Sequence, residues 1–352
     1  MKIIRRDTMN RSLYIDWLRI LATIAVVTIH LAYETLAVNL HDQHLSNWLT
    51  GNLFDSMSRF AVPVFVMISG ALLLNDKREL TYKFFFQRRF NKVLIPFIGW
   101  SAIYYVYEVH EGNFQLSISD FIELILSNSI SVHLWFMYMI LAMYIVTPLL
   151  KIFVKHASKK DILYCLSLWF LVAVLLRILN QYFELSFYIE LNYTANYVGY
   201  FILGYYLSHY EIPIKWRRMS YIGIVIGLFS TFVGTYLATL QTKGVLNEFW
   251  YEDQSPNVLL VSIGLFIFFR YQLTKREMKI PYLAQLINTS SFGIYLIHIL
   301  VIRVLYDSVI MKLFLNLHAF IAIPISILIV VCISSITVFI IKKIPVVKKL
   351  VP

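Results

Sequence analysis

The sequence predicts an all-α integral membrane protein that crosses the bilayer about ten times, and three observations support this fold class. Hydrophobic residues make up 59% of the 352 positions and charged residues only 14%, with a mean hydropathy of +0.69. A soluble domain carries about 25% charged residues. Apolar segments of spanning length recur along the whole chain, and basic residues gather in alternate loops between them. Backbone exposed to lipid must satisfy its own hydrogen bonds, so each span is predicted as a helix.

Ten apolar segments are long enough, or nearly long enough, for the roughly 20 helical residues that a hydrocarbon core requires. The third and the sixth segments are the shortest. In chain order the predicted spans cover residues 15–38, 53–74, 93–109, 131–150, 161–180, 194–208, 220–240, 256–273, 282–306 and 319–341. A basic N-terminal segment of residues 1–14 and a basic tail of residues 342–352 flank this single membrane domain of residues 15–341.

The distribution of Lys and Arg predicts the orientation in the membrane. Twenty-five of the 31 basic residues fall in the N-terminal segment, in every second loop and in the tail. The intervening loops hold only Lys243 and Lys312, and acidic residues such as Glu111, Glu123 and Asp253 dominate there. Cytoplasmic loops of membrane proteins carry the excess of Lys and Arg. Both termini are therefore predicted to be cytoplasmic, in agreement with an even number of spans.

Composition also excludes several classes of function. The formal net charge of +11 does not indicate a nucleic-acid partner, because the basic residues fall in short clusters between apolar runs. Cys165 and Cys332 both lie in apolar segments and are interpreted as buried hydrophobic residues without a disulfide framework. No cluster of residues has the spacing of metal ligands. We expect neither a metal ion nor a bound cofactor.

Two ionisable residues lie inside the first predicted span. An ionisable side chain within a membrane is costly, which makes Arg19 and His30 candidates for function. Eleven residues at about 1.5 Å each separate them by roughly 16 Å along the helix axis, about half the hydrocarbon thickness. Since this span runs outward, Arg19 is predicted near the cytoplasmic face and His30 in the outer half. The alternative role for Arg19 is a local ion pair with Asp16, three residues earlier.

His30 is the candidate for proton transfer. Glu34 follows it by one helical turn, at a spacing that lets a carboxylate orient an imidazole. A neutral imidazole with one nitrogen free can accept a proton from a hydroxyl group. The alternative is a histidine that only packs against a neighbouring helix, and the same alternative applies to His298, which stands alone in an apolar segment.

The other intramembrane arginines are predicted toward the outer side of the membrane. Asp55 precedes Arg59 by four residues and Asp307 follows Arg303 by four, so local ion pairs explain both arginines. Arg177 has no acidic residue one turn away and needs a partner on another helix, a substrate, or the outer interface.

A basic loop over residues 87–92 precedes the predicted third span. Arg88 and Arg89 in it suit phosphate groups, because a guanidinium forms paired hydrogen bonds with a phosphate. The alternative is an ordinary positive-inside anchor. In the second span, Gly70 is predicted to allow close helix packing, and Ser69 either shares that role or lines a ligand path.

Taken together, these stretches resemble the membrane acyltransferase-3 family, the integral-membrane O-acyltransferases that modify bacterial surface glycans. The resemblance runs from about residue 12 to residue 341. Arg19 and His30 match its arginine, ten residues, histidine pattern. The other matching stretches are residues 63–70 with the Phe-x-x-Ser-Gly motif, the basic motif of residues 88–96 ending in proline, His133 to Phe136, and residues 293–298 ending in His298. Lys92 departs from the pattern, because many members have an arginine there.

The resemblance implies a thioester donor, usually acetyl-CoA, used from the cytoplasmic side, and transfer of the acyl group to a sugar hydroxyl. It implies that Arg19, Arg88 and Arg89 bind the phosphates of the donor and that Ser69 lines the path of its pantetheine arm. His30 would take the proton and Glu34 would orient it. The residues expected to hold the glycan or stabilise developing charge are Arg59, Arg177, His133 and His298.

The resemblance also implies a multi-pass protein of the bacterial cytoplasmic membrane, with lipid, acyl-CoA and a glycan acceptor as its partners. Some members carry an extra extracytoplasmic domain, which is expected to be missing here. Either the membrane domain completes the transfer alone, or a separate cell-envelope protein does. Direct transfer and an acyl-enzyme relay both remain open. The rival interpretation is an exporter or flippase of a glycan precursor, which repeated, interrupted helices would favour. A receptor or a membrane scaffold is the third interpretation.

Overall fold

The computed structural model describes residues 2–352 except 77, 79–80, 184–192 and 274–279. Within this part of the chain the structure consists of helices and turns and contains no strand. The prediction of an all-α fold is confirmed. Lys77, Lys275, Arg276 and Lys279, which contribute to the predicted orientation, lie outside the described residues.

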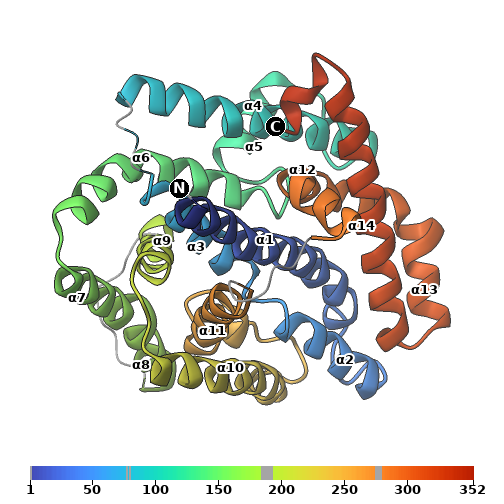
Figure 1. Ribbon diagram of the computed structural model, residues 1–352. Helices are drawn as coiled ribbons and strands as arrows, with labels where there is room; N and C mark the ends of the chain where they lie inside the picture. Colours follow the sequence, from blue (N-terminus) through green and yellow to red (C-terminus); the bar gives the residue numbers. More distant parts are fainter. Residues whose placement is uncertain (1, 77, 79–80, 184–192, 274–279) are drawn as a thin grey trace.

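The described helices follow one another with short connections (Figure 1). The α-helices are α1 (Lys2–Leu36), α2 (Leu45–Ser56), α3 (Ala61–Leu73), α4 (Tyr82–His110), α5 (Ile118–Leu126), α6 (Trp135–His156), α7 (Lys159–Trp169), α8 (Leu176–Phe183), α9 (Tyr193–His209), α10 (Ile214–Gln241), α11 (Pro256–Leu273), α12 (Tyr282–Leu305), α13 (Met311–Asn316) and α14 (Ala319–Lys343). Two π-helices, η1 (Phe170–Leu175) and η3 (Tyr306–Ile310), join α7 to α8 and α12 to α13, and two 3₁₀-helices are η2 (Phe249–Tyr251) and η4 (Val347–Leu350).

Eight helical segments of the described chain are long and apolar enough to cross a membrane. They confirm a polytopic protein. The predicted spans 93–109 and 194–208 correspond to parts of α4 and α9, which are not among the eight, so the count of ten remains a prediction. The eight segments cover Leu13–Leu36, Leu45–Leu73, Trp135–His156, Lys159–Tyr182, Ile214–Gln241, Phe249–Leu273, Tyr282–Asn316 and Ala319–Lys343.

The second span is broken into two helices, where the sequence predicted one continuous span over 53–74. α2 ends at Ser56 and α3 begins at Ala61, with a turn between them. Pro63 explains the break, because a proline has no N–H for the carbonyl four residues before it and its ring collides with that carbonyl. The carbonyl concerned belongs to Arg59. The turn therefore places Arg59 at an interruption within the span.

The basic stretch of residues 87–92 is helical, where the sequence predicted a loop. α4 begins at Tyr82, and the Thr81 hydroxyl caps it by accepting a hydrogen bond from the Phe84 amide at 3.4 Å. A threonine at this position satisfies one of the free amides of a helix start. Successive side chains on a helix point about 100° apart, so Arg88 and Arg89 face different directions.

α1 lies centrally and packs against α2, α3, α11, α12 and α14 (Figure 1). Beside it, α3 and α9 approach so closely that a Cβ added to Gly70 would lie 1.8 Å from the Phe201 carbonyl oxygen. A Cβ on Gly204 would lie 2.0 Å from the Met67 carbonyl oxygen. These distances confirm the predicted packing role of Gly70, since small residues let helix backbones approach.

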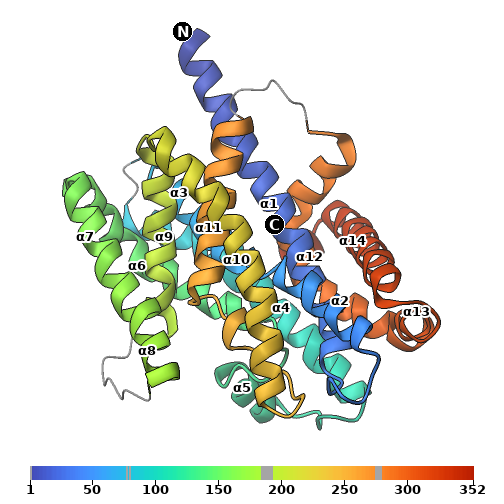
Figure 2. The ribbon, with the colours of Figure 1, turned by 90° about the horizontal axis from the view of Figure 1, so that it is seen from below.

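The long helices run between two ends of the molecule (Figure 2). The end that carries the start of α1, with Arg19, Arg89 and Lys92, is called the basic end below. The other end carries α8 and the segment of residues 242–254 between α10 and α11, and is called the opposite end.

Candidate active site

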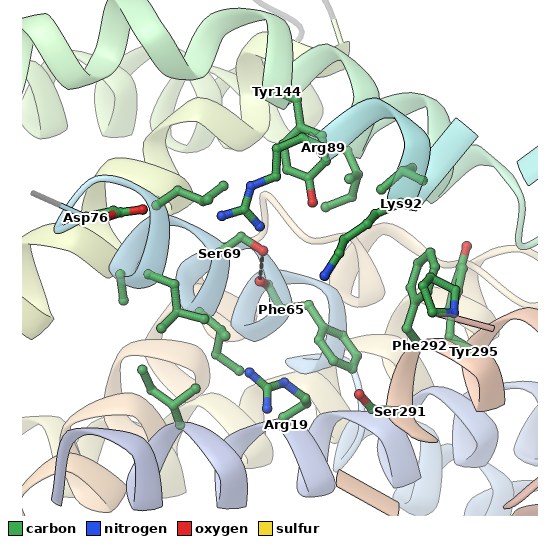
Figure 3. Close-up of a pocket in the computed structure, with 18 of the residues that line it drawn as sticks. Arg19, Phe65, Ser69, Asp76, Arg89, Lys92, Tyr144, Ser291, Phe292 and Tyr295 are labelled. Carbon is green, nitrogen blue, oxygen red and sulfur yellow. Dashed lines mark hydrogen bonds between the residues drawn. The ribbon is translucent and has the colours of Figure 1, made fainter. Parts of the chain in front are cut away.

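A cavity of about 1140 Å³ opens at the basic end. α1, α3, α4, α6 and α12 supply most of its walls. Polar or charged side chains that line it include Arg19, Ser69, Arg89 and Lys92, and aromatic rings close its inner part (Figure 3). The structure thus brings together three of the four residues that the sequence assigned to the donor, on three different helices.

Arg89 and Lys92 point into the cavity from α4 (Figure 3). They are three residues apart, which places them on the same helix face. Neither forms an ion pair with an acidic side chain in the described part of the chain. Arg88 is exposed and lies outside the lining, so its predicted contribution to the same anion site is not supported. Lys92, which departs from the family pattern, lines the cavity instead.

Arg19 lines the cavity from the side opposite Arg89 (Figure 3). Its Nη1 atom donates to the Asp16 carboxylate at 3.0 Å and to the Asn288 amide oxygen at 2.9 Å. The local pair with Asp16 is therefore present, and Asn288 of α12 holds the guanidinium across the helix interface. Asn288 was not singled out from the sequence, because only the tertiary fold brings α12 to α1.

A second ion pair stands at the cavity mouth, between Asp76 and Arg78. The Arg78 Nη2 and Nε atoms donate to Asp76 at 2.7 and 2.9 Å. These hydrogen bonds lower the pKa of Asp76 to about 2, so the carboxylate stays ionised and its charge is cancelled locally. Arg89 and Lys92 line the cavity without an ion pair to any described acidic side chain. Ser69 lies between the two walls and donates to the Phe65 carbonyl at 2.9 Å.

Three histidines from different parts of the chain cluster behind the cavity. The ring centroid of His298 in α12 lies 5.1 Å from that of His30 in α1 and 5.3 Å from that of His133, just before α6. His133 and His298 are fully buried, and His30 is half-buried. The sequence proposed all three residues separately, and the structure places them at one site.

Hydrogen bonds orient two of these rings. His298 Nδ1 lies 2.7 Å from the Tyr295 carbonyl oxygen, which can only accept, so Nδ1 carries the proton and Nε2 is the basic nitrogen. That Nε2 atom is buried and has no hydrogen-bond partner among the described residues. His133 is held by the Ser131 hydroxyl at 3.1 Å and faces the Leu296 carbonyl at 3.4 Å.

The predicted pairing of Glu34 with His30 is not formed. The Glu34 side chain interacts with the Tyr306 hydroxyl in η3 instead, and the His30 ring packs against His298. A spacing of four residues brings two side chains to one helix face but does not decide which neighbour each contacts. His30 has no recorded hydrogen bond within the described chain.

One layer of aromatic rings separates the cavity from the histidines. Phe65, Phe136 and Tyr295 line the cavity, and their ring centroids form a chain with separations of 6.2 and 5.2 Å. The Tyr295 hydroxyl also donates to the His133 carbonyl, and its ring centroid lies 6.1 Å from that of His298. Tyr295 had no role in the sequence interpretation, although it precedes His298 by three residues and thus shares its helix face.

The other three arginines of the predicted spans lie outside the cavity. Arg59 forms a bidentate ion pair with the buried Asp55, and its guanidinium lies 4.0 Å from the ring centroid of Tyr251. Arg177 has no acidic residue one helical turn away and forms an ion pair with Glu252, from a distant part of the chain. Arg303 pairs with Glu108 of α4, where the sequence suggested Asp307.

No group of three His, Cys, Asp or Glu side chains in the described part of the chain is arranged to hold a metal ion. A family model described as an acyltransferase domain matches residues 12–341, nearly the whole chain. The chain belongs to the acyltransferase-3 family. No curated protein and no solved structure matches it.

Membership in this family identifies the protein as a multi-pass membrane acyltransferase. The basic cavity and the adjacent histidines are the candidate active site of this enzyme.

Proposed function

We propose that the enzyme transfers an acyl group, with acetyl as the expected group, from acyl-CoA to a hydroxyl of a cell-surface glycan or its lipid-linked precursor. The basic end faces the cytoplasm of a bacterium in this proposal, and the protein lies in the cytoplasmic membrane. Either the membrane domain completes the transfer alone, or a separate cell-envelope protein completes it. The family membership supports acyl transfer, and the charge distribution supports the orientation.

The choice of acyl-CoA as the donor rests on one observation. Arg89 and Lys92 are cations without recorded acidic partners, and they point into a cavity whose inner wall adjoins the three histidines. Phosphate groups suit such cations, since charge-assisted hydrogen bonds are the strong ones. The thioester end of a long donor anchored there by its phosphates extends past Ser69 toward Phe65, Phe136 and Tyr295.

In the proposed reaction His30 acts on the acceptor. Its ring accepts the proton of a sugar hydroxyl while the hydroxyl oxygen attacks the acyl carbon. The carbon–sulfur bond breaks, and CoA leaves as a thiolate that takes up a proton. His298, whose Nδ1 is fixed by the Tyr295 carbonyl, holds the His30 ring in place from α12. Direct transfer requires the thioester to pass the aromatic layer, and an acyl-enzyme intermediate is the alternative to it.

The test is label transfer from radiolabelled acetyl-CoA in membranes that contain the enzyme, with glycan and protein fractions collected separately. We expect label in the glycan with wild type, and at least a hundredfold less with His30→Ala at equal abundance of protein in the membrane. His110→Ala, at an exposed histidine that does not line the basic cavity, is the matched control and should retain activity. Full activity of His30→Ala would remove His30 from the mechanism. Label in neither fraction with wild type would reject acetyl-CoA as the donor.

A further inference from the structure

A second cleft, of about 900 Å³, lies at the opposite end of the molecule from the basic cavity. α8, the start of α9 and the segment of residues 242–254 line it. Its polar side chains include Arg177, Asn180, Asn196, Asn247, Glu252 and Gln254. The reaction proposed for the basic cavity does not use any of these groups.

Gln254 gives an independent sign of a ligand. Its side chain is only 8% exposed, and its Nε2 atom is buried without a hydrogen-bond partner in the described part of the chain. Most buried polar groups in folded proteins have a partner, and leaving one unpaired is costly. Because Gln254 lines the cleft, a ligand that accepts a hydrogen bond there would satisfy it.

The remaining groups favour a neutral ligand rich in hydroxyl groups. The charge of Arg177 is cancelled by its ion pair with Glu252, and a second carboxylate, Glu248, also lines the cleft. The cleft therefore lacks the excess of positive charge that marks the basic cavity. Side-chain amides both donate and accept, as do hydroxyls, and the Phe249 ring, over which the Arg177 guanidinium lies, adds apolar surface to the cleft. This combination suits a sugar.

The segment that lines the cleft is tied to α9 and to the second span. Asp253, between Glu252 and Gln254, accepts a hydrogen bond from the Tyr197 hydroxyl at 2.7 Å, which ties this segment to α9. Tyr251 of the same segment lies against Arg59, whose guanidinium is 4.0 Å from the Tyr251 ring centroid. Arg59 thus joins the segment that lines the cleft to the second span.

We propose that this cleft is the acceptor subsite, which holds a sugar unit of the glycan while the hydroxyl to be acylated reaches His30. The inference rests on the proposed function, since it names where the acceptor of that same reaction binds. Two classes of ligand are thereby separated in space, with the phosphorylated donor at the basic end and the neutral acceptor at the opposite end.

The experiment uses the purified enzyme in lipid nanodiscs. The probe is a tritium-labelled pool of oligosaccharides, released by mild hydrolysis from envelope glycan of a host that lacks the gene. Equilibrium dialysis measures binding of this pool, and acetyl transfer gives separate KM values for the pool and for acetyl-CoA. The variants are Gln254→Leu, which removes the unpaired amide, and Glu252→Gln. Glu111→Gln is the control, at an exposed acid outside the cleft.

Both cleft variants are expected to weaken oligosaccharide binding and raise the KM for the pool at least tenfold. The KM for acetyl-CoA and all values for Glu111→Gln are expected to stay within twofold of wild type. Equal binding by wild type and both variants, as when the cleft holds only water, would overturn the inference, and so would an absence of binding by wild type. Binding that is lost in the variants, without acetyl transfer by wild type, would support the cleft and reject the proposed donor.

Discussion

The basic cavity and the opposite cleft differ in how their charges are compensated. In the cavity, Arg19 and Arg78 are paired with acids, whereas Arg89 and Lys92 have no recorded acidic partner in the described chain. In the cleft, Arg177 is neutralised by Glu252, and amides supply most of the remaining polar groups. The contrast teaches that an arginine inside a membrane protein indicates an anion site only where the fold leaves its charge uncompensated.

The largest effect is expected from a substitution that disrupts the close packing of α3 against α9. Gly70→Leu forces a side chain into the backbone of α9 at Phe201, where even a Cβ would lie 1.8 Å from an oxygen. Overpacking commonly costs about 1–3 kcal/mol, and a collision with backbone exceeds this range. We expect little folded protein, measured by size-exclusion fluorescence in detergent. Gly223→Ala is the control, because its Cβ would meet Leu260 at 3.5 Å, an ordinary contact. Normal yield of Gly70→Leu would show that α3 and α9 are not held as described.

The next effect tests the uncompensated charge directly, with two neighbouring arginines. Arg89→Gln should raise the KM for acetyl-CoA about tenfold to a hundredfold, because a hydrogen bond to a charged group is worth about 1.5–3 kcal/mol. Arg88→Gln should leave that KM unchanged, since its side chain lies outside the cavity. The measurement is initial-rate kinetics with acetyl-CoA varied in nanodiscs. An unchanged KM for acetyl-CoA in both variants would mean that the basic stretch acts only as a topological anchor.

The smallest effect is the response of each region to salt. Raising the ionic strength from about 0.1 to 1 M shortens the Debye length from about 10 to 3 Å. We expect the KM for acetyl-CoA to rise severalfold, because its binding depends on Arg89 and Lys92. The KM for the oligosaccharide pool should change less than twofold, since the cleft carries no uncompensated cation among its described residues. The same salt dependence for both substrates would contradict the proposed division between the two regions.

The sequence by itself determined the fold class, because hydropathy and the demands of lipid on the backbone leave few alternatives. It also singled out His30, His133 and His298, and the basic stretch before the third predicted span. It could not say that the three histidines meet, since their contacts join α1, α12 and the start of α6. Nor could it separate Arg89 from Arg88, because that depends on the helical start at Tyr82 and on which face of α4 the cavity occupies.

Only the tertiary structure decided the partners of the charged residues. Local spacing suggested that Glu34 contacts His30 and that Asp307 pairs with Arg303. In the folded chain Glu34 interacts with Tyr306, and Arg303 forms an ion pair with Glu108. Arg59 kept its local partner Asp55, within a break in the second span that Pro63 explains. The physical reason is that a buried charge is costly unless it is paired with an opposite charge or a hydrogen-bonding group nearby. In a bundle of long helices that group often lies on a neighbouring helix, far away in the sequence.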